Sequence, residues 1–134
     1  MKNKSLIIWS FRLIPSIILL QTLYFKFSAS PESVYIFKML GLEPYGRILI
    51  GILELIAGVL VLLPRVSWIG AFLGIGLMCG AISSHILKLG IIVMGDGGKL
   101  FIMANIVLLC CLILIWFQRK EIPYIKSHFV SRTK

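Results

Sequence analysis

Four apolar stretches divide the chain, and each is about as long as a bilayer core is thick. They cover residues 5–25, 45–63, 66–89 and 100–117. Apolar runs of about 18 residues or more are typical of transmembrane helices. The runs are continuous rather than alternating, which favours helices over a closed barrel, the other architecture that satisfies backbone groups in lipid. The pattern predicts an all-α integral membrane protein, a four-transmembrane-helix bundle forming a single domain over residues 1–134.

The first connection is the longest and has its own pattern. Ser30 offers a helix N-cap, Pro31 suits the first turn, and Glu32 lies near the positive end of the helix dipole. Gly41 is a typical C-cap. Between them lie the apolar residues Val34, Ile36, Phe37 and Leu40. We expect a short amphipathic helix in this first extracytoplasmic loop, lying over the end of the bundle.

The second and third spans are joined by little more than Pro64 and Arg65, so they must be antiparallel neighbours. Small residues let helix backbones approach closely in a membrane, where lipid supplies no hydrophobic drive. The third span contains two such sets, which predicts close packing of this helix: Gly70 and Gly74, and Gly76, Gly80 and Ser84.

Composition agrees with a membrane bundle that leaves little chain for a soluble domain. Of the 134 residues, 59% are hydrophobic and 14% are charged, and mean hydropathy is +1.00. Soluble domains carry about 25% charged residues. Arg12 interrupts the first apolar run and Pro31 follows the small residues after it, which argues against a cleaved signal peptide.

The net charge of +9 is distributed as in a membrane protein rather than a nucleic-acid-binding one. One side of the predicted bundle carries Lys2, Lys4, Arg65, Arg119, Lys120, Lys126, Arg132 and Lys134, and the other carries Lys26, Lys38, Arg47, Lys88 and Lys99. Basic residues concentrate on the cytoplasmic side of membrane proteins. Both termini are therefore expected in the cytoplasm, with a basic tail over residues 118–134. That tail is expected to touch anionic lipid or, as an alternative, to dock a partner.

Glu54 is the one ionisable residue in the second apolar run. An acid at the centre of a membrane helix costs about 2.5–3.5 kcal/mol, so such residues usually have a partner or a function. At about 1.5 Å per residue, Glu54 lies roughly 10 Å below the outer face. By the same rise, His85 lies roughly 6 Å and Asn105 roughly 7.5 Å from that face, and Gln21 lies at a similar depth. Each span thus contributes one polar side chain to a single layer.

Helical angles refine this layer. Glu54 shares a face with Gly51, Ala57 and Gly58, a small-residue face suited to packing, so its side chain should point into the bundle. We expect His85 as its neighbour and Lys26 as its counter-charge, while Arg12 lies deeper toward the cytoplasm. Two interpretations stay open. The cluster is either an internal polar clasp, with Glu54 and His85 hydrogen-bonded, or a pocket that binds a ligand or moves protons.

The cysteines do not indicate redox or metal chemistry. Cys79, Cys110 and Cys111 fall near mid-bilayer without a C-x-x-C pair, and buried cysteine usually packs as a small hydrophobe. No zinc-ligand spacing is present. The glycine-rich segment 95–99 ends like a phosphate loop but lacks the strand before it and the Ser or Thr after it, so a turn is predicted.

Two segments carry a family likeness. Residues 37–64 contain Gly51-x-x-Glu54-x-x-Ala57-Gly58 before Pro64, and residues 78–85 contain Gly80-Ala81 followed by His85. In these motifs the chain resembles the DoxX-like family of small four-helix integral membrane proteins. Arg12 and Lys26 are similar to the basic residues of the family's first span. The resemblance implies a multi-pass protein of the bacterial plasma (inner) membrane. Some members are subunits of quinone-linked sulfur oxidation or associate with redox partners, and most have no assigned activity.

These observations together predict an accessory or redox-linked subunit rather than an enzyme acting alone. The expected ligand-binding or proton-handling residues are Glu54, His85, Lys26, Arg12, Asn105 and Gln21. A quinone is the candidate cofactor, no metal is expected, and no catalytic residue is assigned. The alternative is a non-catalytic protein that binds lipid or stabilises a partner, as a chaperone does. Expected partners are membrane lipids, a redox or other membrane protein, or a second copy of the chain, but no nucleic acid.

Overall fold

The computed structural model describes residues 2–120 and 122, and four of its helices are long and apolar enough to cross a membrane. The long helices are α1 (Lys2–Phe27), α3 (Tyr45–Leu62), α4 (Ser67–Ser84) and α5 (Lys99–Gln118). A short π-helical turn, η1 (His85–Leu89), continues α4, so the predicted third span is two elements. The predicted four-helix membrane architecture is confirmed. Most of the predicted basic tail lies outside the described residues.

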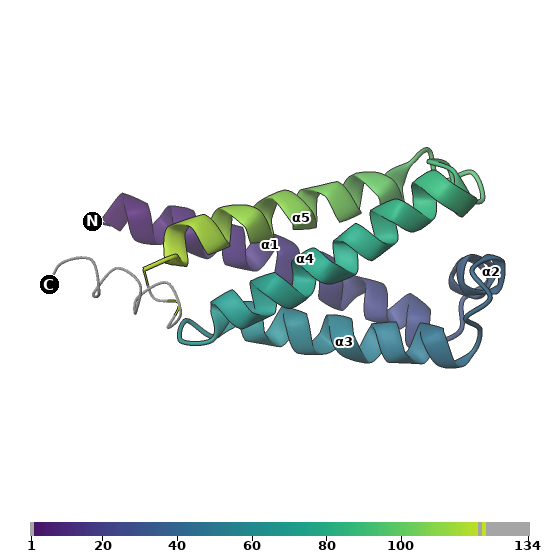
Figure 1. Cartoon of the computed structure of the whole chain (residues 1–134), viewed down its shortest axis with the longest axis horizontal. Helices are drawn as coiled ribbons and strands as arrows, with labels where there is room; N and C mark the ends of the chain where they lie inside the picture. Colours follow the sequence, from purple (N-terminus) through teal and green to yellow (C-terminus); the bar gives the residue numbers. More distant parts are fainter. Residues whose placement is uncertain (1, 121, 123–134) are drawn as a thin grey trace, which may run out of the picture.

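The four long helices form an up-and-down ring (Figure 1). Helix α1 packs against α3 and α5, and α4 packs against the same two helices from the other side. We call the end with the start of α1, the α3–α4 turn and the end of α5 the terminal end. The opposite end, which carries α2, η1 and the connection from η1 to α5, is the lid end (Figure 1). Consecutive long helices are therefore antiparallel neighbours, and the short turn between α3 and α4 requires this for that pair.

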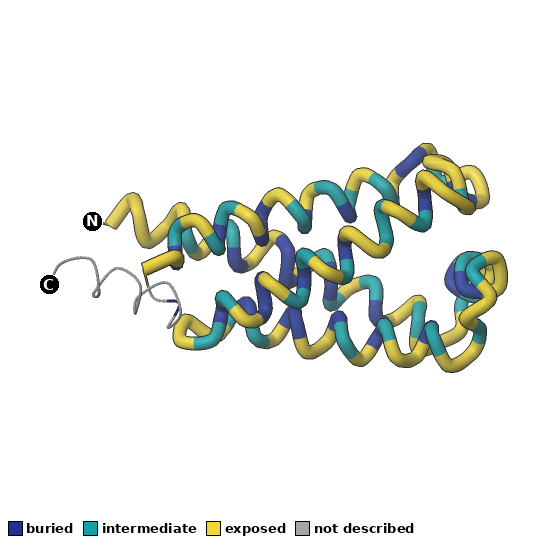
Figure 2. The backbone as a smooth tube through the Cα atoms, viewed as in Figure 1, coloured by how far each residue is buried: buried dark blue, intermediate teal, exposed yellow. Residues whose placement is uncertain are grey.

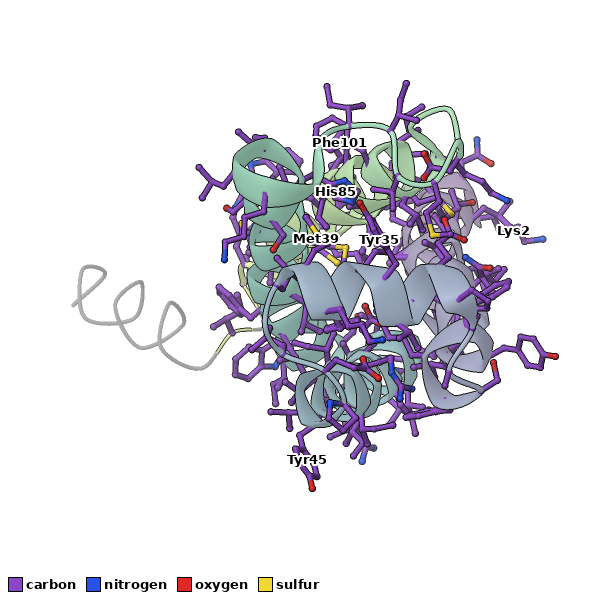
Figure 3. The ribbon with its side chains drawn as sticks, turned by 90° about the vertical axis from the view of Figure 1, so that its right-hand side faces the viewer. Lys2, Tyr35, Met39, Tyr45, His85 and Phe101 are labelled. Atoms are coloured by element: carbon purple, nitrogen blue, oxygen red, sulfur yellow. The ribbon has the colours of Figure 1, made fainter. Side chains whose placement is uncertain are left out.

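Helix α2 (Pro31–Met39) is the amphipathic helix expected in the first loop. Its first turn is capped because the backbone N–H of Ser33 donates to Oγ of Ser30 over 3.3 Å, and Pro31 occupies the first helical position. The chain then leaves the helix through Gly41, whose φ of 71° suits the predicted glycine C-cap. Helix α2 lies across the lid end, with Ser33 and Phe37 buried beneath it (Figure 3).

Unlike a soluble bundle, this one exposes many large apolar side chains and buries several polar ones. Many large apolar side chains of the four long helices are exposed, among them Leu13, Ile17, Leu49, Ile102 and Leu109. The buried set instead includes charged and polar residues: Arg12, Ser16, Arg47, Glu54, Ser67, His85 and Gln118. In Figure 2 the buried positions follow the inner faces of the helices and the exposed ones their outer faces. An apolar exterior around a partly polar interior is the arrangement of a helix bundle surrounded by lipid.

Small residues hold α4 close to its neighbours, but only on one of the two predicted faces. A Cβ on Gly70 would lie 2.6 Å from the backbone nitrogen of Val61, and one on Gly74 would lie 2.9 Å from Sγ of Cys111. A Cβ on Gly76 or Gly80 would meet nothing within 4 Å. The prediction of close packing is therefore right for the first glycine pair and wrong for the second set, which faces outward.

The cysteines divide in the same way. Cys110 and Cys111 on α5 are buried, as expected for side chains that pack in the core. Cys79 is exposed, so its predicted place in the core is wrong. In the sequence it lies between Gly76 and Gly80, on the side of α4 that faces outward.

Candidate functional site

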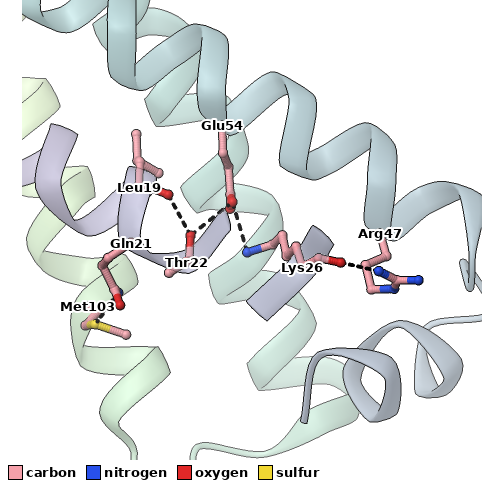
Figure 4. A network of polar contacts seen from close by, with 7 residues as sticks. All are labelled: Leu19, Gln21, Thr22, Lys26, Arg47, Glu54 and Met103. Carbon is pink, nitrogen blue, oxygen red and sulfur yellow. Dashed lines mark hydrogen bonds and ion pairs between the residues drawn. The ribbon is translucent and has the colours of Figure 1, made fainter. Parts of the chain in front are cut away.

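Glu54 forms an ion pair with Lys26 near the lid end of the α1–α3 interface. Nζ of Lys26 lies 2.9 Å from Oε2 of Glu54, and the two side chains are 15% and 7% exposed (Figure 4). Glu54 comes from the middle of α3, where Gly51 and Gly58 on the same face let α1 approach. Lys26 comes from the last turn of α1, where a cation is favourable beside the negative end of the helix dipole. The counter-charge proposed from depth alone is in place.

Thr22 is the third member of this cluster, and sequence reasoning missed it. Its Oγ1 lies 3.2 Å from Oε2 of Glu54 and 2.8 Å from the carbonyl oxygen of Leu19. A hydroxyl has one proton, so Thr22 shares its donation between these two acceptors. The signal was available, because Thr22 precedes Lys26 by four residues and so lies on the same face of α1.

Arg47 joins the same two helices by a hydrogen bond, and it is itself paired with Glu43 just before α3. Its Nε lies 2.9 Å from Oε1 and 3.0 Å from Oε2 of Glu43, and Nη1 donates to the backbone carbonyl of Lys26. The last carbonyls of a helix have no partner within the helix, so Arg47 satisfies one at the end of α1. Arg47, two helical turns before Glu54, thereby ties the start of α3 to the end of α1.

His85 does not join this cluster, so the expected contact with Glu54 is wrong. His85 is 5% exposed and lies 2.8 Å, by its Nδ1, from the carbonyl oxygen of Gly90. Its ring meets that of Phe101 edge to face at 5.7 Å. Among residues 2–120 and 122, no hydrogen bond or ion pair links it to Glu54. The reason is visible in Figure 1, where α4 runs obliquely away from α3 toward α5 as it approaches the lid end.

Asp96 organises the loop that follows η1. Its carboxylate accepts from the backbone N–H groups of Val93, Gly98 and Leu100 over 2.9–3.2 Å. Partial burial raises the pKa of Asp96, but these three donors outweigh it, and together with nearby His85 they hold the pKa below its ordinary value of 3.8. The turn predicted for residues 95–99 is present, and Asp96 occupies the place that a bound phosphate would take in a phosphate loop.

The other predicted site residues lie elsewhere. Gln21 is exposed on α1 and reaches only Sδ of Met103, at 3.5 Å (Figure 4). Asn105 donates to the carbonyl of Phe101 in its own helix over 2.8 Å. Arg12 is buried near the terminal end, 14 residues before Lys26 along α1, with its guanidinium 5.1 Å from the ring centre of Trp9. The predicted layer thus separates into a charged α1–α3 cluster and a distinct histidine site.

The two parts differ in what they can do chemically. In the charged cluster, Glu54 is engaged by Lys26 and Thr22, and no buried nitrogen or oxygen in the cluster lacks a hydrogen-bond partner. In the histidine site, the Gly90 carbonyl can only accept, so Nδ1 must carry a proton. Nε2 of the neutral ring is then an acceptor, and no described residue bonds to it. No group of three metal-ligating side chains occurs within the described part of the chain.

Comparison with known proteins gives one match. The model of the DoxX-like family matches residues 14–115, which include α2, α3, α4 and η1, the second half of α1 and most of α5. Both Glu54 and His85 fall within the matched region. No curated protein and no solved structure matches the chain.

Proposed function

Because the chain belongs to the DoxX-like family, we propose that it is an accessory membrane subunit that holds a lipophilic, quinone-like ligand at its lid end. The ligand-facing residue in this proposal is His85, and the chain does no chemistry alone. Glu54 and Lys26, expected from the sequence to bind the ligand, serve instead to hold α1 against α3.

One observation carries the proposal, the orientation of the His85 ring. Because Nδ1–H is donated to Gly90, neutral His85 presents Nε2 as a hydrogen-bond acceptor within a nearly buried side chain. A quinol hydroxyl can donate to such an acceptor, whereas a quinone offers only carbonyl acceptors. Neutral His85 therefore favours the reduced form of the ligand, and protonated His85 favours the oxidised form, which its Nε2–H can bind.

The surroundings of His85 suit an aromatic head and a hydrocarbon tail. Phe101 lies against the imidazole, and α2 directs Tyr35 and Met39 toward η1 (Figure 3). Exposed apolar side chains surround this site on η1 and the loop after it: Ile86, Leu87, Ile91 and Ile92. A ligand head beside Phe101 could thus extend its tail into the lipid without crossing a polar surface.

The test is the quinone content of the protein purified in mild detergent from its native membrane. We compare the wild type with His85→Asn, because the Asn amide can still donate to Gly90 but has no atom in place of Nε2. We expect quinone or quinol in the wild type, its loss in His85→Asn, and its retention in Glu54→Gln. A wild type without quinone, or equal content in all three proteins, would refute the proposal.

The second candidate function is a non-catalytic subunit that stabilises a membrane partner or binds lipid. The Glu54 cluster favours it, because a carboxylate whose Oε2 is bound by both Lys26 and Thr22 holds α1 against α3. A partner that stays bound in mild detergent, together with an absence of quinone, would favour this candidate. The partner could be a redox protein, another membrane protein or a second copy of the chain.

The proposal places the protein in the bacterial plasma membrane with both termini in the cytoplasm. The sequence supports this orientation because eight basic residues are expected on the side of the termini and five on the other side. Fusing a reporter that is active on only one side of the membrane to each terminus tests it. Activity of both fusions on the outer side would reverse the orientation.

A further inference from the structure

A groove of about 290 Å³ runs along the first turns of α1 at the terminal end. It is lined by Lys4, Ser5, Ile8, Trp9 and Arg12. These residues are spaced by three or four positions, with two adjacent pairs, so they form one continuous face of the helix. We propose that this groove binds the phosphate-bearing headgroup of an anionic membrane lipid. The inference does not depend on the function proposed for His85.

The chemistry of the lining is that of an anion site. Lys4, Arg12, Ser5 and the indole N–H of Trp9 are hydrogen-bond donors, and two of them carry a positive charge. Arg12 is only 7% exposed and its guanidinium lies over the Trp9 ring, which fixes the orientation of the charged group. The guanidinium fork matches the geometry of phosphate oxygens.

Charge at this end of the molecule is unbalanced within the described residues. The described acids are Glu32, Glu43, Glu54 and Asp96, and all of them lie in α2, in the middle or at the start of α3, or in the lid-end loop. The described cations at the terminal end are Lys2, Lys4, Arg12, Arg65, Arg119 and Lys120. The described residues at this end thus carry a positive charge that attracts an anion.

The level of the groove in the membrane favours a lipid headgroup over a free anion as its ligand. Where α1 and α3 touch, Gly51 faces Phe27 and Gly58 faces Leu20. Continuing this antiparallel register places Arg12 level with Val66, in the turn that ends the α3 span. Arg12 therefore lies at the edge of the hydrocarbon layer and Trp9 about 4.5 Å further out, the level at which tryptophan and lipid phosphates are found.

The outer side of the same helix is suited to acyl chains. Leu6, Leu13 and Ile17 are exposed on α1, so the chains of a lipid held in the groove can lie along an apolar surface.

The experiment measures lipid retained by the full chain in native mass spectrometry, from micelles with equimolar phosphatidylglycerol and phosphatidylcholine. We expect selective retention of phosphatidylglycerol and about a fivefold loss of that retention in Lys4→Gln, the effect of one basic residue near a membrane surface. Lys99→Gln, which removes an exposed cation at the lid end, is the matched control and should retain phosphatidylglycerol as the wild type does.

Two results would overturn the inference. One is equal retention of the two lipids by the wild type, or equal loss in Lys4→Gln and Lys99→Gln. The other is displacement of phosphatidylglycerol by millimolar inorganic phosphate, which would make the groove a site for free anions. Arg12→Gln is expected to lose more retention than Lys4→Gln. Because Arg12 is buried and could also affect folding, the decision rests on Lys4.

Discussion

The ion pair between Glu54 and Lys26 makes a quantitative prediction about stability. The two charges are 2.9 Å apart. At an effective dielectric constant of about 20, their attraction is about 6 kcal/mol, but removing each ion from water costs several kcal/mol, which offsets most of this gain. The pair therefore adds little net stability relative to a well-packed apolar pair, whereas removing one partner leaves a charge in apolar surroundings.

The two single variants should differ in cost. Lys26→Met leaves the Glu54 carboxylate, 7% exposed, with only the shared hydroxyl of Thr22, and we expect a loss of about 3–5 kcal/mol in the free energy of unfolding. Glu54→Gln leaves Lys26, which is 15% exposed in the last turn of α1 and can extend its ammonium toward the interface. Its expected cost is about 1–2 kcal/mol.

The assay is a double-mutant cycle measured by equilibrium unfolding in mixed micelles. We expect the double variant Lys26→Met/Glu54→Gln to be more stable than the sum of the single effects implies, by about 2 kcal/mol, because it has no stranded charge. Lys38→Met removes an exposed lysine of α2 and should change stability by less than about 0.5 kcal/mol. If the changes in the free energy of unfolding are strictly additive, or if Lys26→Met is as stable as the control, Glu54 does not hold α1 against α3 through Lys26.

Three further predictions test other parts of the bundle. Gly70→Ala should lower the free energy of unfolding by about 1–3 kcal/mol, because its Cβ would lie 2.6 Å from a backbone nitrogen of α3. Gly76 is open to lipid, so Gly76→Ala should be neutral or stabilising by up to about 1 kcal/mol in the same unfolding assay. Ser16→Ala should lower the free energy of unfolding by about 0.5–1.5 kcal/mol, since it removes a buried 2.8 Å hydrogen bond to the Gly58 carbonyl, which remains part of helix α3. A loss above about 3 kcal/mol would contradict this account. Because the pKa of Asp96 is lower in the folded protein than its ordinary value of 3.8, the ionised carboxylate stabilises the loop at pH values above 3.8. This stabilisation is lost as the pH falls through the pKa of Asp96 in the folded protein. Amide exchange in the loop, corrected for intrinsic rates, should therefore accelerate on acidification below pH 3.8 in the wild type and show no such change in Asp96→Asn.

The helices of this protein could be predicted from the sequence because each has a strong local signal. Apolar length defined the four spans, and Ser30, Pro31 and Gly41 marked the ends of α2. The counter-charge of Glu54 could also be predicted, since few cations of the neighbouring spans lie within reach of its depth. Depth and helical angle were sufficient for contacts between α1 and α3, which run side by side through the whole span.

The histidine site could not be predicted in the same way, because depth fixes the level of a residue but not the course of its helix. His85 lies at the expected level, yet α4 has moved away from α3 by the time it reaches the lid end (Figure 1). The crossing follows from Gly70, which holds the two helices together near the terminal end. Gln21 shows the same limit, since its depth was reasonable but its side chain points outward.

The positions of these contacts have a consequence for where the bundle can open. Near the lid end, helices α1 and α3 are held together by the Glu54–Lys26 ion pair and by the hydrogen bond from Arg47 to the Lys26 carbonyl. Helices α3 and α4 touch most closely at Gly70, near the terminal end, and α4 is held to α5 at Gly74. Within the described residues, no ion pair or hydrogen bond between side chains joins the α1–α3 pair to the α4–η1 segment at the lid end. The α4–α5 hairpin can therefore separate from α1 and α3 at the lid end without breaking a charged contact, and His85 lies on the side that such a movement would expose.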